Sequence, residues 1–275
     1  LAPQTLPSNL GTSSISQAVL DSISTLAAVT DLILVEGPDL TIDGGQPSSL
    51  ASDLASLTNS KAILVVQYKR DLDAATIGNL AKPFQERLLG LIINHAPIHR
   101  RQEIARELIQ PLRNNGLPVL GAIPEDRFML SVTVQQIIEH LNGEWVQEPE
   151  NINAHVDRFL IGGNIMDSGP SYFGRYPNQA VITRAERPDI QMASLMCDTK
   201  CLVLTGGEEP TEYVRVEARK KGVPLISVAG GTISTAEALN GLLERANPHS
   251  LAKVRQFATL MQVHLDLETL ISSLI

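Results

Sequence analysis

Two polar residues follow apolar runs in the first half of the chain, where their side chains could bind a metal and a base. Glu36 comes directly after the run Asp31–Val35, and Asn94 follows Gly90–Ile93. At the carboxyl edge of a parallel sheet, a carboxylate can hold Mg²⁺ against triphosphate charge, and an amide offers both a donor and an acceptor. The alternative is that Glu36 caps the turn after its strand and that Asn94 serves turn chemistry.

No phosphate-binding loop accompanies these two residues. A loop that cradles the β- and γ-phosphates needs Gly-x-x-x-x-Gly-Lys followed by Ser or Thr, and the 275 residues contain no Gly-Lys pair. We therefore expect this chain not to hydrolyse ATP. ATP and Mg²⁺ are expected as ligands only if such a loop precedes Leu1 in a longer protein.

The second half contains a candidate anion site made of glycine turns and arginines. Thr205-Gly206-Gly207 ends one apolar run, and Gly230-Gly231-Thr232 follows the next. Turns of this kind before a helix can present outward N–H groups, and helix N-termini attract anions. Arg184 and Arg187 are the cations best placed to hold an anion there. The alternative is that the glycines only make tight turns and the charges are solvated.

Histidines and cysteines predict neither a metal site nor a catalytic thiol. His95 and His99 have the four-residue spacing of metal ligands on a helix, but Pro97 breaks such a helix. Cys197 and Cys201 are the only cysteines, too few for a disulfide framework or a four-ligand zinc site. Nothing in the sequence identifies a basic partner that would lower a thiol pKa.

Alternating strands and helices must position the residues of the first half. Apolar runs predict buried strands at 31–35, 62–66, 89–93 and 118–123, and segments of helical length lie at 14–28, 48–57, 71–80 and 100–114. Strands separated by helices predict right-handed crossovers and a parallel sheet. The fold class expected is therefore α/β.

A smaller α/β alternation follows a polar linker. The stretch 142–151 is the best linker candidate, so we expect domains at 1–145 and 152–275, with first proteolytic cleavage between them. After a strand at 158–161, three strand-turn-helix units begin at residues 179, 200 and 224. The tail 251–275 has apolar residues at helical spacing, interrupted near Asp266.

Composition excludes several classes of protein. With 43% hydrophobic and 19% charged residues the chain should fold as a globule, and a net charge of −8 gives no electrostatic footprint for nucleic acid. No apolar stretch is long enough for a membrane span. We expect a cytoplasmic protein that self-associates as a homo-oligomer through its second domain and tail, with a protein partner as a further expectation.

Several segments together resemble a known family. The runs Leu34–Gly37, Gly90–Asn94 and Pro118–Asp126, with Leu130–Val132, resemble the dethiobiotin-synthetase-like P-loop domain of long bacterial phosphotransacetylases and their shorter relatives. Residues 156–243 resemble the DRTGG domain that follows it in that family. The turn that the family usually writes Thr-Gly-Gly-Asp-Arg reads Thr-Arg-Ala-Glu-Arg at 183–187.

The resemblance implies a regulatory or assembly protein on a nucleotide-binding fold, without the phosphotransacetylase catalytic domain and without acetyl transfer. It implies that Glu36 is the magnesium-side acid, that Asn94 is the amide near the base, and that Pro124 and Glu125 lie in the loop flanking the nucleotide. The alternative function is an ATP-dependent enzyme of the dethiobiotin synthetase type that activates a carboxylate by phosphorylation.

Overall fold

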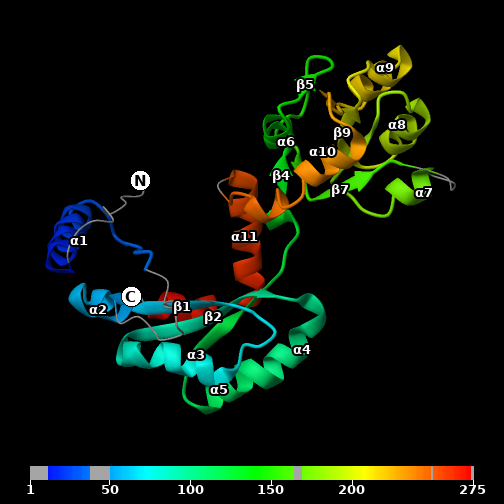
Figure 1. Cartoon of the computed structure of the whole chain (residues 1–275). Helices are drawn as coiled ribbons and strands as arrows, with labels where there is room; N and C mark the ends of the chain where they lie inside the picture. The colour runs from blue at the N-terminus through cyan, green and yellow to red at the C-terminus, as the bar shows by residue number, and fades with distance from the viewer. Residues whose placement is uncertain (1–11, 38–49, 164–168, 249, 274–275) are drawn as a thin grey trace. The chain divides into compact units, whose positions relative to one another are not determined.

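The chain forms two compact units, which we describe separately. The computed structural model describes residues 12–37, 50–163, 169–248 and 250–273 (Figure 1). Residues 1–125 and 260–275 make the first unit, and residues 126–259 make the second. None of the helices within these described ranges is long and apolar enough to cross a membrane.

The first unit is built on a parallel sheet with the order β1-β2-β3. These strands are Ala62–Gln67, Leu88–Ala96 and Val119–Pro124, which confirms three of the four predicted strands. The connections carry α3 (Ala74–Ala81), a 3₁₀ segment (Lys82–Arg87), and a helical stretch with α4 (Arg101–Ile104) and α5 (Gln110–Asn114). Their apolar side chains pack on one sheet face, with Ile77, Leu108 and Leu112 buried against Leu91 and Ile93.

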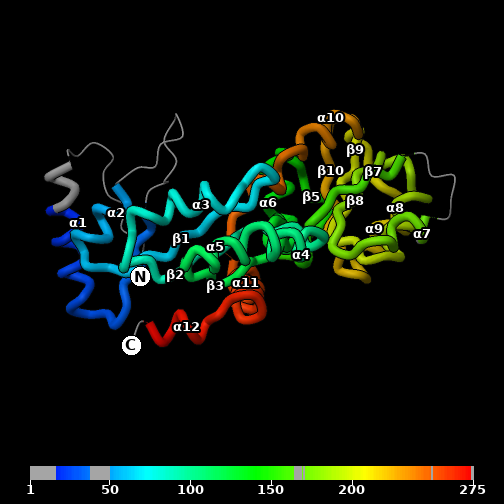
Figure 2. The backbone as a smooth tube through the Cα atoms, turned by 90° about the horizontal axis from the view of Figure 1, so that it is seen from below, coloured from blue at the N-terminus to red at the C-terminus, as the bar shows by residue number. Residues whose placement is uncertain are grey.

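The C-terminal tail covers part of the opposite sheet face. Helix α11 (Leu251–His264) ends just before Asp266, whose carboxylate caps α12 (Leu267–Ser272), so the predicted interruption is confirmed. The buried Leu265 and half-buried side chains of α12 pack on Ile92, Leu120 and Ile123. As Figure 2 shows, α12 lies beside β3.

The predicted strand at 31–35 is wrong. Residues 32–37 have no regular secondary structure between α1 (Thr12–Ala27) and α2 (Leu50–Leu57), and Leu34 is 86% exposed. An apolar run becomes a strand only when a neighbour satisfies its backbone N–H and C=O groups. Within the described residues this run pairs with no strand. The first two residues of the predicted helix at 48–57 lie outside the described residues.

The second unit contains a five-stranded sheet with the order β5-β10-β9-β8-β7. Strands β7 (Arg158–Ile161), β8 (Gln179–Arg184), β9 (Thr199–Thr205) and β10 (Leu225–Val228) are parallel, and β5 (Glu144–Trp145) joins β10 antiparallel. This confirms the predicted α/β architecture.

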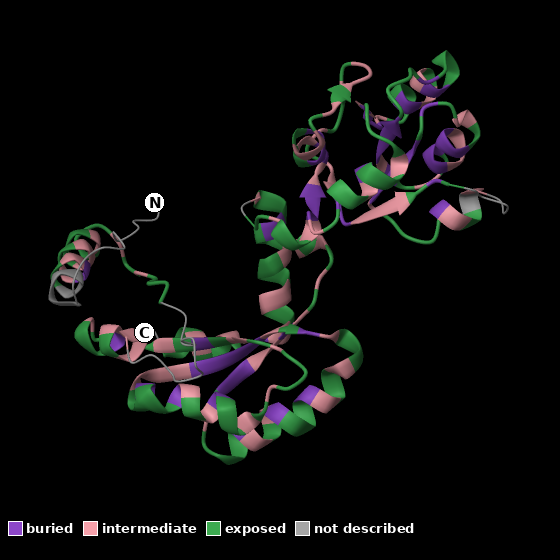
Figure 3. Ribbon diagram, in the orientation of Figure 1, coloured by how far each residue is buried: buried purple, intermediate pink, exposed green. Residues whose placement is uncertain are grey.

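Helices cover both faces of this sheet. Alternate residues of β9 point to opposite faces: Cys201 and Val203 pack with α6 (Val134–Leu141) and α10 (Thr232–Ala238), and Leu202 and Leu204 pack with α8 (Pro188–Leu195) and α9 (Glu212–Lys220). The short helix α7 (Gly169–Phe173) adds the buried Phe173 to the second face. Figure 3 shows the buried residues concentrated on the strands and on the inner faces of the helices.

The compact units divide the chain differently from the domains that the sequence suggested. The division falls after Glu125 and not within 142–151, and the tail from residue 260 belongs to the first unit. The apolar face of α6 packs on the second sheet, and the polar stretch itself contains β5. A two-stranded ladder of β4 (Val132–Thr133) with β6 (His155–Val156) also lies in the second unit.

Candidate functional site

The carboxyl ends of three parallel strands meet at one edge of the second sheet. Arg184, the last residue of β8, pairs in register with Thr205, the last residue of β9. Thr205 in turn pairs with Val228 at the end of β10. The turns after all three strands therefore gather at the same edge, where α/β sheets usually bind ligands.

Two of these turns are tied directly to each other. The Gly206 N–H donates to the Gly230 carbonyl (3.0 Å), and the Gly207 N–H donates to the Val228 carbonyl (3.2 Å). The hydroxyls of Thr205 and Thr232 are hydrogen-bonded at 2.9 Å. Gly206 and Gly207 have φ angles of 99° and 75°, a region that other residues rarely adopt. The expectation that both amides point outward is therefore wrong, because both already bond to the protein.

The two predicted arginines differ in their partners. Arg187 forms a bidentate pair with Asp189 at 3.0 and 2.8 Å, and its hydrogen bond lowers the pKa of that carboxyl. Arg184 is exposed, and across the described ranges no ion pair involves it. Of the two, only the Arg184 guanidinium has its charge available to a ligand.

Gln191 holds the turn after β8 and was missed in the sequence. Its side-chain amide is fully buried and donates to the carbonyls of Arg184 (2.8 Å) and Ala185 (3.0 Å). The same contact fixes the backbone from which the Arg184 side chain extends. No sequence signal distinguishes Gln191 from the other polar residues of a helix.

Three of the four predicted nucleotide residues lie at neighbouring strand ends in the first unit. Asn94 is near the end of β2, Pro124 ends β3, and the Glu125 N–H donates to the Ala96 carbonyl at 3.0 Å. The Asn94 side-chain oxygen accepts from the His95 N–H at 3.0 Å. Glu36 is exposed and lies outside any strand, so the predicted strand-end position of this magnesium-side acid is wrong. Nucleotide binding by these residues stays a prediction.

A separate polar cluster in the second unit surrounds the β4–β6 ladder. The Ser131 hydroxyl donates to the Phe128 carbonyl (2.6 Å) and lies 2.8 Å from His155 Nδ1. Because its proton is directed to a carbonyl, this hydroxyl is not arranged as a nucleophile with His155 as its base. Burial, and then the charge of Lys253, lower the pKa of His155. Lys253 is 1% exposed and donates to the Asn247 carbonyl at 2.9 Å.

The described residues contain no group of three His, Cys, Asp or Glu side chains arranged to hold a metal ion. The two units together define a class of protein in which one parallel α/β unit precedes a second α/β unit with glycine turns at its carboxyl edge. Comparison with known families agrees with this class: residues 2–129 match the AAA domain family and residues 136–242 match the DRTGG domain family. The chain therefore combines an AAA domain of the dethiobiotin-synthetase-like type with a DRTGG domain, which confirms the predicted resemblance.

Curated relatives carry the same region within longer proteins. The chain is 27% identical to a phosphate acetyltransferase of Nitratidesulfovibrio vulgaris over 94% of its length and 39% of that protein. It is 24% identical to a phosphate acetyltransferase of Synechocystis over 90% of its length and 38% of that protein. The chain thus spans about two fifths of the length of these relatives.

A solved structure with partial similarity contains the CBS and DRTGG domains of the regulatory region of Clostridium perfringens pyrophosphatase, in complex with its activator diadenosine tetraphosphate. The TM-score is 0.34 at 12% identity, covering 66% of this chain and 72% of that structure.

Proposed function

We propose that this chain is a regulatory or assembly module of a phosphotransacetylase-related protein, and that its DRTGG unit binds an anionic effector. The observation that supports a regulatory role most directly is the match of this chain to an AAA domain and a DRTGG domain. The chain is also similar to phosphate acetyltransferases over at least 90% of its length. Acetyl transfer itself is not assigned to these residues.

The chemistry of the effector follows from the carboxyl edge of the second sheet. Arg184 offers an exposed guanidinium, and the turn behind it is held by two hydrogen bonds from Gln191. A guanidinium binds carboxylate or phosphate through two parallel N–H donors. Thr205 and the turn at 230–232 lie at the same edge, but the Thr205 hydroxyl is buried and bonded to that of Thr232, so the proposed contact rests on Arg184.

Isothermal titration calorimetry of the whole chain with ATP, free of Mg²⁺, tests the proposed effector site. Replacing Arg184→Ala should weaken binding about tenfold, equivalent to about 1.4 kcal/mol, because one charge-assisted contact is lost. Arg175→Ala is the matched control, since Arg175 is also exposed but precedes β8 at the opposite edge of the sheet. Equal affinity of the Arg184 variant and the unaltered chain would refute the site.

An assembly role makes a second measurement informative. Sedimentation velocity of the same chain, with and without ATP, should show a change in oligomer size if the module acts through assembly. Val254 on α11 is 58% exposed, so Val254→Glu tests the predicted self-association without disturbing the packing of Met261 in the first unit. The enzymatic alternative of the dethiobiotin synthetase type gains no support from Glu36, which lies outside the sheet.

A further inference from the structure

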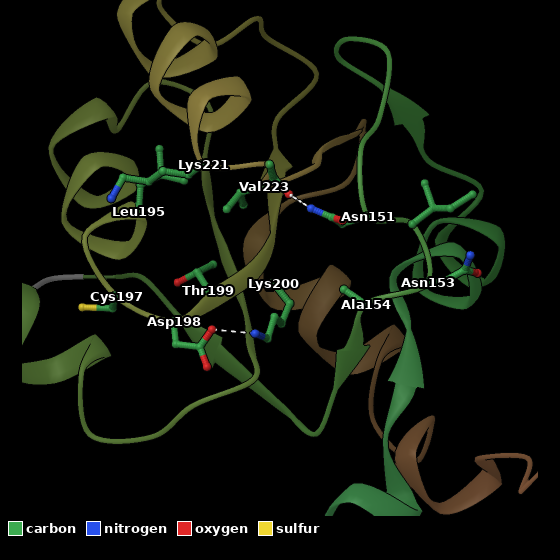
Figure 4. A pocket seen from close by; sticks show the side chains of 12 residues that line it. Asn151, Asn153, Ala154, Leu195, Cys197, Asp198, Thr199, Lys200, Lys221 and Val223 are labelled. Atoms are coloured by element: carbon green, nitrogen blue, oxygen red, sulfur yellow. Dashed lines mark hydrogen bonds and ion pairs between the residues drawn. The ribbon is translucent and has the colours of Figure 1, made fainter. Parts of the chain in front are cut away.

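We propose that a cavity at the amino edge of the second sheet is a binding site for a small organic anion, separate from the Arg184 edge. The cavity has a volume of about 880 Å³, within the range of small-molecule sites. Figure 4 shows its lining, which comes from the loop at 151–154, the α8–β9 connection and the α9–β10 connection. Strand β9 runs from this edge at Thr199 to the glycine turn at Thr205, a span of about 20 Å.

The residues that line the cavity include two lysines, Lys200 and Lys221, and one carboxylate, Asp198. The Glu150 carboxylate lies near the rim at Gly222 but does not line the cavity. Lys200 donates to Asp198 at 2.6 Å, so that pair is neutral. Burial alone would raise the pKa of Asp198, but hydrogen bonds from Lys200 and the Asn178 amide lower it, which keeps the carboxylate charged.

The positive charge of Lys221, the second lysine of the lining, is only partly neutralised by a carboxylate. Lys221 lies 3.7 Å from Glu217, and Lys220 approaches the same carboxylate at 3.8 Å. Two ammonium groups therefore share one carboxylate, and one positive charge remains. Lys221 lines the cavity and Lys220 does not. An ammonium group in this state has N–H donors to offer an anion.

The rim of the cavity is already formed. The Asn151 side-chain amide donates to the Gly222 carbonyl at 2.9 Å, which joins the loop before β6 to the turn after α9. Both residues have positive φ, 54° for Asn151 and 62° for Gly222. A Cβ at Gly222 would lie 2.6 Å from Asn151 Nδ2, so glycine is required for this close approach. A site that is formed before binding loses less entropy when the ligand arrives.

The lining also contains a thiol. Leu195 and Val223 form part of the wall but are buried, so the ligand we expect is defined by its anionic group. Cys197 lines the same cavity, where burial raises the pKa of its thiol and the charge of Lys221 opposes that effect. Cys201 is fully buried, and burial raises its pKa to about 12. The two cysteines therefore provide a reporter inside the cavity and an internal reference.

Alkylation of Cys197 by iodoacetamide in the whole chain, followed by peptide mass spectrometry, tests the site. Butyrate, inorganic phosphate and AMP are titrated separately, with sodium chloride at equal ionic strength as the reference. We expect saturable protection of Cys197 by at least one of these anions. Protection by butyrate alone would support the site and assign a carboxylate ligand, whereas protection by AMP and phosphate would support it and assign a phosphate ligand.

Matched lysine variants make the test specific. Lys221→Gln should weaken binding of the protecting anion about tenfold, whereas Lys82→Gln, which removes the same charge from an exposed position of the first unit, should weaken it less than about threefold. Arg184→Ala should leave protection unchanged, so failure of the Arg184 site and failure of this one are distinguishable. The proposal is overturned by absence of protection up to about 10 mM ligand, by equal protection with chloride, or by equal effects of the two lysine variants.

Discussion

Gly121 decides whether the C-terminal tail can pack on the first sheet. A Cβ built at Gly121 would lie 2.1 Å from the His264 carbonyl oxygen and 3.1 Å from a methyl carbon of Leu265. The first of these atoms is backbone, so it cannot move aside by a change of rotamer. Gly121 also forms an isolated antiparallel bridge with Leu265. The substitution Gly121→Ala should therefore force the tail away from β3.

The magnitude follows from the contacts that the methyl group would displace. The Asp266 N–H donates to the Leu120 carbonyl at 2.8 Å, and such a bond contributes about 1 kcal/mol net. Leu265 is 8% exposed, and re-exposing a leucine of this kind costs about 2 kcal/mol. We expect Gly121→Ala to lower the free energy of unfolding of the first unit by about 3 kcal/mol.

Urea denaturation and hydrogen exchange of the whole chain measure this effect. The urea midpoint should fall, and amides of residues 265–272 should exchange faster than in the unaltered chain. Exchange of the β9 amides, which lie in the second unit, should stay the same. Gly163→Ala is the control, because a Cβ at Gly163 meets no atom of the described residues within 4 Å. An unchanged midpoint together with unchanged exchange at 265–272 would refute the reasoning.

Three further substitutions in the second unit test its buried polar groups. Gln191→Ala removes two hydrogen bonds to the turn after β8. In urea titrations it should lower the free energy of unfolding by about 2 kcal/mol, and hydrogen exchange at residues 184–187 should become faster. Burial, and then the charge of Lys253, lower the pKa of His155 in the folded chain from 6.5. As the pH falls through 6.5 the unfolded state takes up the proton first, so stability should decline as the pH falls below that value, and His155→Gln should flatten that decline. Lys253→Met removes a buried ammonium group that forms no ion pair in the described part of the chain. In urea titrations at pH 7 it should raise the free energy of unfolding by about 1 kcal/mol. An unchanged or lowered free energy would contradict this prediction.

The central strands of the second sheet were predictable because they are buried on both faces. Residues 179–183, 200–205 and 224–228 were expected to be strands, and the structure has β8, β9 and β10 at Gln179–Arg184, Thr199–Thr205 and Leu225–Val228. The middle of a central parallel strand is apolar, as Ala180–Ile182 and Cys201–Leu204 are, and that composition is visible in the sequence. The run 31–35 has the same composition, but among the described residues no strand pairs with it, and composition alone cannot reveal this.

The positions of the candidate site residues were more predictable than their contacts. Arg184 and Thr205 are the last residues of two neighbouring parallel strands. Once both strands are placed correctly, it follows that the two residues lie side by side at one edge of the sheet. Side-chain partners depend on rotamers and on neighbours from other elements. The Arg187–Asp189 pair has a visible signal, since an acid follows the arginine by two residues across a proline. The contact of Gln191 with the turn has none.

The surroundings of the Cys197 thiol show why the sequence did not predict a site at the amino edge of the second sheet. Its basic neighbour Lys221 lies 24 positions away in the chain, at the end of α9, and only the parallel pairing of β9 with β10 brings their two connections together. Glycine turns mark the carboxyl edge of a parallel sheet in the sequence, whereas the amino edge is assembled from helix ends that share no motif. Ligand sites at the carboxyl edge can therefore be proposed from spacing. A site at the amino edge has to be inferred from the charges and the cavity that the fold brings together.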